Sequence, residues 1–600
     1  MATDPRTEAM RACAGWLLVL LFLLGTHRLS AQTASATLQT TPNASKAVER
    51  FNHGLLAVKR GDLAGARQSF ESAVRANPKL PEAQSMLGWV LLSLGDVDPA
   101  IAHLKEGIRL NPKVAEPHIT LARAYLLRRD AALALKEAQT AVQLAPQNPE
   151  SDHVLAHALE FSGQVAPASA AIRRAIDLND SNAEFHDDLG SLLVQEGKAE
   201  EAIAQYREAI RLNEAFGPAH FHLGVLELDE KRFDDAANDL RRATELMPGN
   251  FLAFAYLGEA ERERGEIELA IGALQASVKI NPDQPSAQGQ LGLLLQRVGR
   301  PDEAAAAFRE CIRMEPTNPM PQNSLGLSLL QAGDGDGAIA AFREAVRLRP
   351  EDPQYQGNLG TAYLQKADFA AAVAEFEAAL QRAPADQTLH YNLGLALKLQ
   401  DKLPEAMAEL RKAEAIDPSQ PDAPYTLGVT LWQQGENDEA VEELEKAIKA
   451  KPDYAEAYYT LGTVLKQQGK FPEAATALRE AIRLQPDFAG AHTTLAAILR
   501  QMGDTPGAAQ EAKLGNRLAK QKTDLQATLF ATNSGKRLLR VGDLNAAISQ
   551  FRSAIATSPD YAPAHYQLGI ALQQQGKKEE AKLEFEKAAE LDPKFKVPDL

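Results

Sequence analysis

Residues 455–488 read AEAYYTLGTVLKQQGKFPEAATALREAIRLQPDF, and this stretch decides the fold. Small residues stand at its positions 8, 20 and 27, which are Gly462, Ala474 and Ala481. Side chains this small let two helices approach until their backbones nearly touch. Gly469, between the two segments, tolerates the positive φ that ends a helix. The stretch therefore predicts two helices that are joined by a turn and packed closely together.

The same pattern recurs along the chain at a constant interval of 34 residues. Fourteen units occupy residues 47–522, and two more, 528–561 and 562–595, follow an insertion at 523–527; a tail, 596–600, remains. Proline is frequent at position 32, where it ends the second helix because it has no N–H to donate. Position 8 of the first fourteen units is Gly54, Gly88, Ala122, Ala156, Gly190, Gly224, Gly258, Gly292, Gly326, Gly360, Gly394, Gly428, Gly462 and Ala496.

An isolated helical pair cannot bury the apolar face that it presents to its neighbours, so successive units must stack to complete a core. The pattern resembles the tetratricopeptide repeat (TPR) family, and residues 455–488 are close to an idealised unit of that family. The resemblance implies an all-α fold, a right-handed superhelical α-solenoid of about 16 helix-turn-helix repeats with a long concave groove.

The first residues follow the order of segments found in a secretory signal peptide. Basic residues precede an apolar run, Trp16–Leu24, and small residues follow it. The run is too short for a membrane span, which needs about 20 residues. We therefore predict a signal peptide at 1–31, with cleavage as late as Ala36, and export to the periplasm or the extracellular space. Residues 37–46 are predicted to form a flexible lead-in to the first repeat.

The composition and the extent of the repeats exclude several classes of function. The formal net charge of −16 disfavours nucleic acid as a partner, because an acidic surface repels phosphate backbones. The repeats leave no stretch long enough for a catalytic domain, so we expect neither an enzyme nor a cofactor. Of the two cysteines, Cys13 lies in the predicted signal, which leaves Cys311 without an intrachain disulfide partner.

The resemblance also implies a working surface, because in TPR proteins positions 2, 5, 9, 12 and 13 of the first helix line the groove. In repeats 11 to 14 these positions carry rings, amides and cations. Rings supply contact area at low entropy cost, amides can bond a peptide backbone, and cations attract acidic side chains. We predict that this part binds extended peptide segments, the alternative being a generic repeat surface. The predicted partner-binding residues are Tyr391, Lys398, Tyr425, Trp432, Gln433, Tyr459, Lys466, Gln467, Arg500 and Gln501.

The charge reverses locally around the insertion, where seven basic residues stand against only Glu511 and Asp524. These bases could dock an acidic partner or, peripherally, an anionic membrane surface; alternatively they form the solvated face of an extended helix. The array also lacks a polar capping helix after the last repeat, so a second copy of the chain could cover that end. This basic seam consists of Lys513, Arg517, Lys520, Lys522, Lys536, Arg537 and Arg540.

One pair of histidines has a metal-like spacing. His153 and His157 are one helical turn apart, Glu160 follows one turn later, and Asp187 stands at the position of His153 in the next repeat. Two imidazoles and two carboxylates can hold zinc. Six of the twelve histidines, however, occur at packing position 4, so histidine is tolerated in these helices. We therefore predict no metal, with His153, His157 and Glu160 as the candidates if one binds.

Repeats 6 and 7 depart from the pattern at position 11, where they carry Glu227 and Glu261 in place of a large apolar residue. This departure predicts a loosened seam and identifies a candidate hinge. The alternative is that neighbouring side chains compensate.

Taken together, these features predict a non-enzymatic scaffold for protein–protein interaction. Its groove would bind extended segments of partner proteins in the cell envelope or outside the cell. The alternative is an accessory subunit of an envelope machine for polysaccharide synthesis or secretion, held by the basic seam or by the uncapped C-terminal end.

Overall fold

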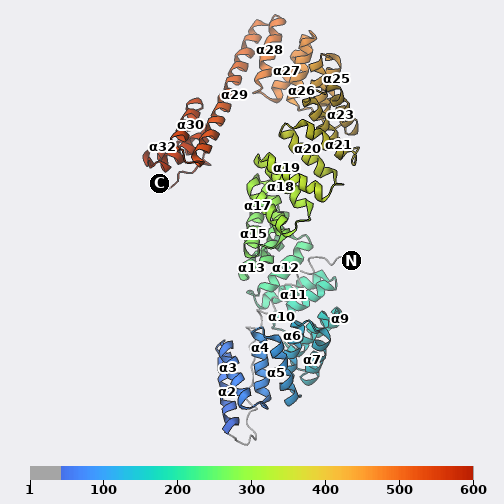
Figure 1. Ribbon diagram of the computed structural model, residues 1–600, viewed down its shortest axis with the longest axis vertical. Coiled ribbons are helices and arrows are strands. Elements are labelled where there is room, and N and C mark those ends of the chain that lie inside the picture. The colour runs from blue at the N-terminus through green and yellow to red at the C-terminus, as the bar shows by residue number, and fades with distance from the viewer. Residues whose placement is uncertain (1–41, 599–600) are drawn as a thin grey trace. The chain divides into compact units, whose positions relative to one another are not determined.

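The computed structural model describes residues 42–598, and in that range the chain forms 31 helices, α2 to α32, and no strand. The predicted all-α class is therefore confirmed. The predicted signal peptide at 1–31 and both of its cleavage sites lie outside the described residues. The chain divides into two compact units, Met1–Pro316 and Thr317–Leu600 (Figure 1).

Unit 1 contains the first eight repeats, each a pair of helices of which we call the first A and the second B. Within the unit, each A helix packs on the B helix of its own repeat, and each B helix but the last packs on the A helix that follows it. The A helices are α2 (Pro42–Lys59), α4 (Pro81–Ser93), α6 (Ala115–Leu127), α8 (Pro149–Phe161), α10 (Ala183–Gln195), α12 (Gly217–Asp229), α14 (Phe251–Glu263) and α16 (Pro285–Arg297). The B helices are α3 (Leu63–Ala76), α5 (Val97–Leu110), α7 (Ala131–Leu144), α9 (Val165–Leu178), α11 (Ala199–Leu212), α13 (Phe233–Leu246), α15 (Ile267–Ile280) and α17 (Pro301–Met314).

Unit 2 contains the other eight repeats in the same alternation. Its A helices are α18 (Pro319–Ala332), α20 (Pro353–Gln365), α22 (Gln387–Leu399), α24 (Asp422–Gln434), α26 (Ala455–Gln467), α28 (Ala489–Gln501) and α31 (Ala562–Gln574). Its B helices are α19 (Gly335–Leu348), α21 (Phe369–Leu380), α23 (Leu403–Ile416), α25 (Asn437–Ala450), α27 (Phe471–Leu484), α30 (Leu544–Thr557) and α32 (Lys578–Leu591). The remaining helix, α29 (Thr505–Arg540), belongs to two repeats.

The inserted residues 523–527 are helical and lie within α29, a single helix of 36 residues that runs between α28 and α30 (Figure 1). Gly515 of α29 packs against Thr493 of α28, and Gly535 packs against Phe551 of α30. The helix therefore serves as the B helix of repeat 14 and the A helix of repeat 15, because no proline stops it between them.

At the other end of the array, the first helix is longer than the repeat pattern predicts. Helix α2 begins at Pro42, so residues 42–46, predicted to belong to a flexible lead-in, are helical. Proline is tolerated in the first turn of a helix, where its missing N–H has no intrahelical acceptor.

The glycine at position 8 is the point of closest approach between the two helices of a repeat. In repeat 7, a Cβ on Gly258 would lie 2.7 Å from Cγ of Leu274 and 3.3 Å from the carbonyl oxygen of Ala270. In repeat 13, a Cβ on Gly462 would lie 2.7 Å from Cγ of Leu478. Carbon atoms do not pack at that distance, so the helices can lie this close only because the side chain is absent.

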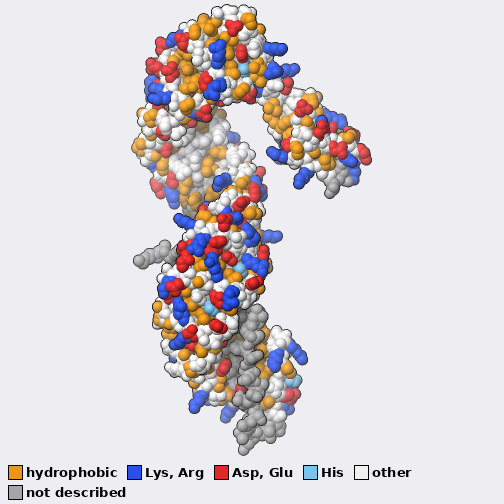
Figure 2. Space-filling model, turned by 180° about the vertical axis from the view of Figure 1, so that it is seen from behind, with side chains coloured by type: hydrophobic (Ala, Val, Ile, Leu, Met, Phe, Trp, Pro, Cys, Tyr) orange, Lys and Arg blue, Asp and Glu red, His pale blue; other side chains and the backbone are white. Residues whose placement is uncertain are grey.

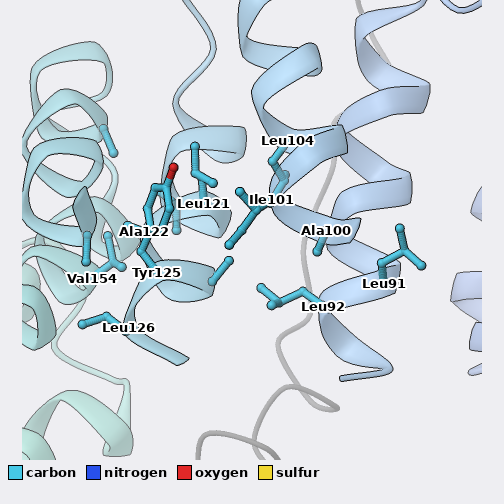
Figure 3. Close-up of a cluster of buried hydrophobic side chains, with 14 of the residues drawn as sticks. Leu91, Leu92, Ala100, Ile101, Leu104, Leu121, Ala122, Tyr125, Leu126 and Val154 are labelled. Atoms are coloured by element: carbon cyan, nitrogen blue, oxygen red, sulfur yellow. The ribbon is translucent and has the colours of Figure 1, made fainter. Parts of the chain in front are cut away.

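Within the first four repeats the core is continuous from one repeat to the next. In the first four repeats, buried side chains from α4, α5, α6 and α8 form one cluster, with Leu91, Ile101, Tyr125 and Val154 among its members (Figure 3). Each repeat thus completes the core of its neighbour, as expected for a chain whose helical pairs are not stable alone.

The two layers of helices are not equally spaced. Most consecutive A helices approach one another closely, as α4 and α6 do in unit 1 and α22, α24 and α26 do in unit 2. Between residues 42 and 598, no two consecutive B helices come as close. A stack must curve toward its more closely spaced layer, so within each unit the A helices line the inner side of the curve.

The glutamates at the suspected hinge are buried and paired with arginines of the preceding B helix. Glu227 of α12 is 0% exposed and accepts a hydrogen bond of 3.2 Å from Nη2 of Arg207, while Glu261 of α14 accepts one of 2.6 Å from Nη2 of Arg241. Burial, with Asp239 nearby, raises the pKa of Glu227 to about 7. Nη1 of Arg264 also donates to the second oxygen of Glu261, whereas Oε2 of Glu227 is buried and has no hydrogen-bond partner within the described residues. Neighbouring side chains therefore compensate for Glu261 and only in part for Glu227.

A pair of glycine substitutions within repeat 7 tests the close approach at position 8. Gly258→Val should lower the free energy of unfolding by about 1–3 kcal/mol, because its side chain must displace Leu274. Gly272→Val on α15 is the matched control: a Cβ there meets no atom within 4 Å, so its stability should be unchanged or slightly raised. Urea unfolding followed by circular dichroism measures both. Equal effects would contradict the packing described for position 8.

The buried carboxyl of Glu227 should make stability depend on pH. Because its pKa is raised in the folded state, the native chain holds this proton more tightly than the unfolded chain, and stability falls as pH rises from about 4.5 toward 7. Glu227→Gln should therefore stabilise the protein by about 1–3 kcal/mol at about pH 8 and much less at about pH 5. Thermal unfolding at the two pH values checks this. Glu230→Gln, an exposed control at the end of α12, should have no such pH-dependent effect, and a uniform gain from Glu227→Gln would contradict the account.

Candidate functional site

The predicted partner-binding residues come from four consecutive A helices of unit 2, namely α22, α24, α26 and α28. Positions 5, 9 and 12 of a helix follow one another at about one turn, and position 13 is about one turn from position 9, so their side chains share one face. Neighbouring members of this set of helices lie side by side. The structure therefore brings the predicted residues together on one surface, which we call the A face of repeats 11 to 14.

Two of the three tyrosines on this face stack on aromatic residues at position 34, the last residue of a repeat. The ring centroids of Tyr425 and Tyr454 are 4.9 Å apart, and those of Tyr459 and Phe488 are 4.7 Å apart. Nζ of Lys451 lies 4.9 Å from the centroid of Tyr454. Tyr454 and Phe488 are not among the predicted residues, although an aromatic residue at the same position of two consecutive repeats is a signal that could have identified them.

Trp432 is linked to the next repeat through its indole. Its Nε1 donates a hydrogen bond of 2.7 Å to Oε1 of Gln467. The side-chain carbonyl of Gln467 is engaged in this bond, and its NH₂ group remains able to donate to a ligand. The tryptophan ring is half-buried and its orientation is held by Gln467, while Gln433 and Gln501 are exposed.

The three predicted cations differ in exposure. Lys398 and Lys466 are half-buried and Arg500 is exposed. Burial lowers the pKa of Lys398. Within the part of the chain that the structure describes, none of the three forms a salt bridge, so their charges are available to an acidic ligand.

The basic seam lies along α29. Six of its seven side chains are exposed and Lys536 is half-buried, and within residues 42–598 none of the seven takes part in a salt bridge. Nδ1 of His492 lies 2.5 Å from Oε2 of Glu511, one of the two acids nearby. The same helix also exposes the hydrophobic residues Leu525, Leu529 and Phe530, the last of them 72% exposed.

Elsewhere the surface is mixed. On the face shown in Figure 2, acidic and basic side chains alternate with hydrophobic ones. The charge pattern of that face therefore does not indicate a binding site. The candidate sites are instead identified by the individual side chains of the A face and of the basic seam.

The histidines at position 4 fasten the two helices of a repeat together. In repeat 11, Nδ1 of His390 lies 2.6 Å from Oε2 of Glu409 on helix B, and Nε2 lies 3.0 Å from the carbonyl oxygen of Pro384 in the preceding turn. Each of the six histidines makes the corresponding bond to a side chain 19 residues later. The pairs are His118–Glu137, His186–Gln205, His220–Asp239, His390–Glu409, His492–Glu511 and His565–Glu584.

His153 and His157 do meet, but not with the predicted third residue. Their Nε2 atoms are 2.9 Å apart, and the carboxylate that joins them is that of Asp188 on α10. The predicted Glu160 instead accepts a hydrogen bond of 2.6 Å from Nε2 of Gln195. Glu160 therefore lies outside the cluster that the two histidines form with Asp188, because its side chain is engaged further along the helix.

Five of the side-chain hydrogen bonds between neighbouring A helices join residues that are 35 apart, one more than the repeat. The A helices are thus offset by one residue, so that position 5 faces position 6 of the next repeat and position 12 faces position 13. The pairs are His153–Asp188, Asp187–His222, Asn323–Asn358, Glu160–Gln195 and Trp432–Gln467.

Comparison with family models identifies repeats of one kind in both units. Models described as TPR repeat or tetratricopeptide repeat match residues 51–115, 85–149, 358–421, 431–469, 462–503, 535–576 and 562–595. A model of the C-terminal domain of cilia and flagella-associated protein 70 matches residues 181–359. No curated protein sequence matches the chain.

Several solved structures are similar to parts of the chain. YrrB, described as a TPR protein with an unusual peptide-binding site, is 22% identical over 30% of this chain and 94% of its own, with a TM-score of 0.29. A thermophilic TPR protein from Thermus thermophilus is 23% identical over 30% of this chain and 99% of its own, with a TM-score of 0.28. A chain of the APC/C hetero-tetramer Cut9–Hcn1 is 16% identical over 76% of this chain and 96% of its own, with a TM-score of 0.33.

Between residues 42 and 598, no helix combines the length and the apolar character that crossing a bilayer requires.

Proposed function

We propose that this chain, a protein built from tetratricopeptide repeats, is a non-enzymatic scaffold that binds extended segments of partner proteins on the A face of repeats 11 to 14. A scaffold for protein–protein interaction is the general role of this repeat fold. The observation that carries the finer proposal is a set of half-buried rings on α22, α24 and α26. It is accompanied, on the same A helices and on α28, by exposed amides and by cations that form no salt bridge within the described residues.

The chemistry of this face suits an extended, acidic segment. Tyr425 and Tyr459 are held by stacking on Tyr454 and Phe488. A ligand that packs on the two tyrosines therefore costs little side-chain conformational entropy. The exposed amides of Gln433 and Gln501 can pair with the backbone of an extended chain, which has no internal partners for its N–H and C=O groups. Lys466 and Arg500 would select acidic side chains.

The inner position of this face also supports the proposal. The A helices line the inner side of the curve in each unit, where side chains from several repeats converge on one ligand. We infer, from the order of basic, apolar and small segments before the repeats, that the protein is exported and meets its partners in the periplasm or outside the cell.

A second candidate function rests on α29. Its unpaired bases and the exposed Leu525, Leu529 and Phe530 form a surface that could hold the chain on an acidic partner or, peripherally, on an anionic membrane. In that case the chain would be an accessory subunit of an envelope machine for polysaccharide synthesis or secretion. Leu583 of α32, which is exposed near the C-terminal end, could serve a second copy of the chain there.

The A face is tested by substitutions combined with tryptophan fluorescence. In a Trp89→Phe background, a partner or an acidic peptide recovered from envelope extract should shift the emission of Trp432 on binding. Trp432→Ala should weaken binding by about 30-fold, or about 2 kcal/mol, because central aromatic residues dominate interface energies. Calorimetry measures this change in affinity.

Charge reversal supplies the control for this experiment. Lys466→Glu and Arg500→Glu should also weaken binding, whereas Lys449→Glu, an exposed change on the B helix α25, should not. Equal losses from Lys449→Glu and Lys466→Glu, or no loss from Trp432→Ala, would contradict a specific site on the A face.

The basic seam is tested by the triple reversal Arg517→Glu, Lys520→Glu, Lys522→Glu. If the A face is the binding site, this variant should bind the partner with an affinity within about twofold of the original chain, because exposed charges far from a ligand contribute little. Pulldown from envelope extract, with a triple reversal at Lys449, Lys470 and Arg479 as the charge-matched control, measures this. Loss of all partners in the seam variant alone would favour the accessory-subunit function.

A further inference from the structure

Two pairs of potential ligands face each other where repeats 4 and 5 meet in unit 1. Helix α8 presents His153 and His157, one turn apart, and α10 presents Glu184 and Asp188, also one turn apart. Nε2 of His153 lies 2.7 Å from Oδ2 of Asp188, and Nε2 of His157 lies 3.3 Å from the same oxygen. With the 2.9 Å between the two nitrogens, three lone-pair atoms converge on one point.

The size of this triangle suits a small divalent ion. Zinc is bound by histidine nitrogen and carboxylate oxygen at about 2.0–2.2 Å, and tetrahedral geometry then places the ligand atoms about 3.3 Å apart. The three observed separations are between 2.7 and 3.3 Å. The ligand atoms would therefore need to move apart by only a few tenths of an ångström to accept the ion.

The other nitrogen of His153 lies near a carboxylate. It is buried and makes no hydrogen bond, and its nearest acidic group is Oε2 of Glu150, at 3.7 Å. Glu150 is itself held by Nη2 of Arg123 at 2.5 Å. A carboxylate beside the distal nitrogen of a ligating histidine favours the tautomer that leaves Nε2 free to bind metal.

The orientation of His153 is fixed by packing as well. The side chain is 3% exposed, and its ring centroid lies 4.8 Å from that of Phe185. His157 and Asp188 keep about a quarter of their side-chain surface accessible, 25% and 23%, so an ion can enter and water can reach it. The site thus combines a rigid buried ligand with two accessible ones.

The neighbouring titratable groups are committed elsewhere. Both oxygens of Asp187 pair with Nδ1 of His222, at 2.9 and 3.1 Å, and Glu160 is bound by Gln195. Glu184, one turn before Asp188, is half-buried beside the histidines and is the protein group best placed for a fourth position.

We propose that His153, His157 and Asp188 form a binding site for a divalent transition-metal ion of the zinc class, with the fourth position taken by Glu184 or water. Imidazole nitrogens and a carboxylate are ligands that this class of ion accepts. Because the ligands come from two consecutive A helices, the ion joins repeats 4 and 5 and stabilises unit 1. This site is separate from the A face of repeats 11 to 14 and does not depend on its function.

The test uses the full mature chain without a histidine tag, stripped of metal by a chelator. Titration with ZnCl₂ followed by calorimetry should show one site per chain, and added ZnCl₂ should raise the melting temperature. Replacement of zinc by Co²⁺ should give the intense visible absorption of a tetrahedral site. His157→Ala and Asp188→Asn should abolish both the binding and the rise in melting temperature.

Two further variants separate ligation from folding. Glu160→Gln, at the residue first predicted as a ligand, should bind zinc as the original chain does. Glu150→Gln should weaken zinc binding by about 10–100-fold while leaving the melting temperature of the metal-free chain nearly unchanged, since Glu150 positions His153 rather than ligating the ion. Absence of zinc binding in the original chain, or unchanged binding in a folded His157→Ala variant, would overturn the proposal.

Discussion

The close approach of the two helices within each repeat is the constraint on which the rest of the molecule depends. A glycine at position 8, such as Gly258 or Gly462, removes the one side chain that would hold helices A and B apart. The paired helices can then present their remaining apolar side chains to the next repeat, and the core becomes continuous. The closer spacing of the A helices follows from the same stacking and places the A helices on the inner side of each unit.

Much of the fold follows from the sequence because this constraint repeats at a fixed interval. Small residues, turn glycines and prolines recur in register, so the helices can be assigned from the amino-acid pattern alone. Where the register breaks, prediction was less complete: residues 523–527 join two repeats in α29 instead of separating them. The pairing of Glu227 with Arg207 was also not foreseen, because it depends on which side chain of the preceding B helix reaches position 11.

The candidate sites were predicted in part for a related reason. Spacing along one helix showed that His153 and His157 share a face, but it could not show which residue of the next helix meets them. The offset between neighbouring A helices brings position 6, not position 5, of the next repeat into contact, so Asp188 rather than Asp187 joins the histidines. The same offset joins Trp432 to Gln467 on the A face of repeats 11 to 14. One-residue offsets of this kind arise from packing between helices and are not encoded in the periodicity of any single helix.

The proposed scaffold function depends on whether partners touch the A face in the native setting, and site-specific photo-cross-linking measures this most directly. A photoreactive residue introduced in place of Gln433, which is exposed on the A face, should form adducts with partner proteins that mass spectrometry can identify. The same residue introduced in place of Lys449, on the B helix of the same repeat, should form few or none. Adducts at Lys449 as abundant as those at Gln433, or none at Gln433, would contradict the account.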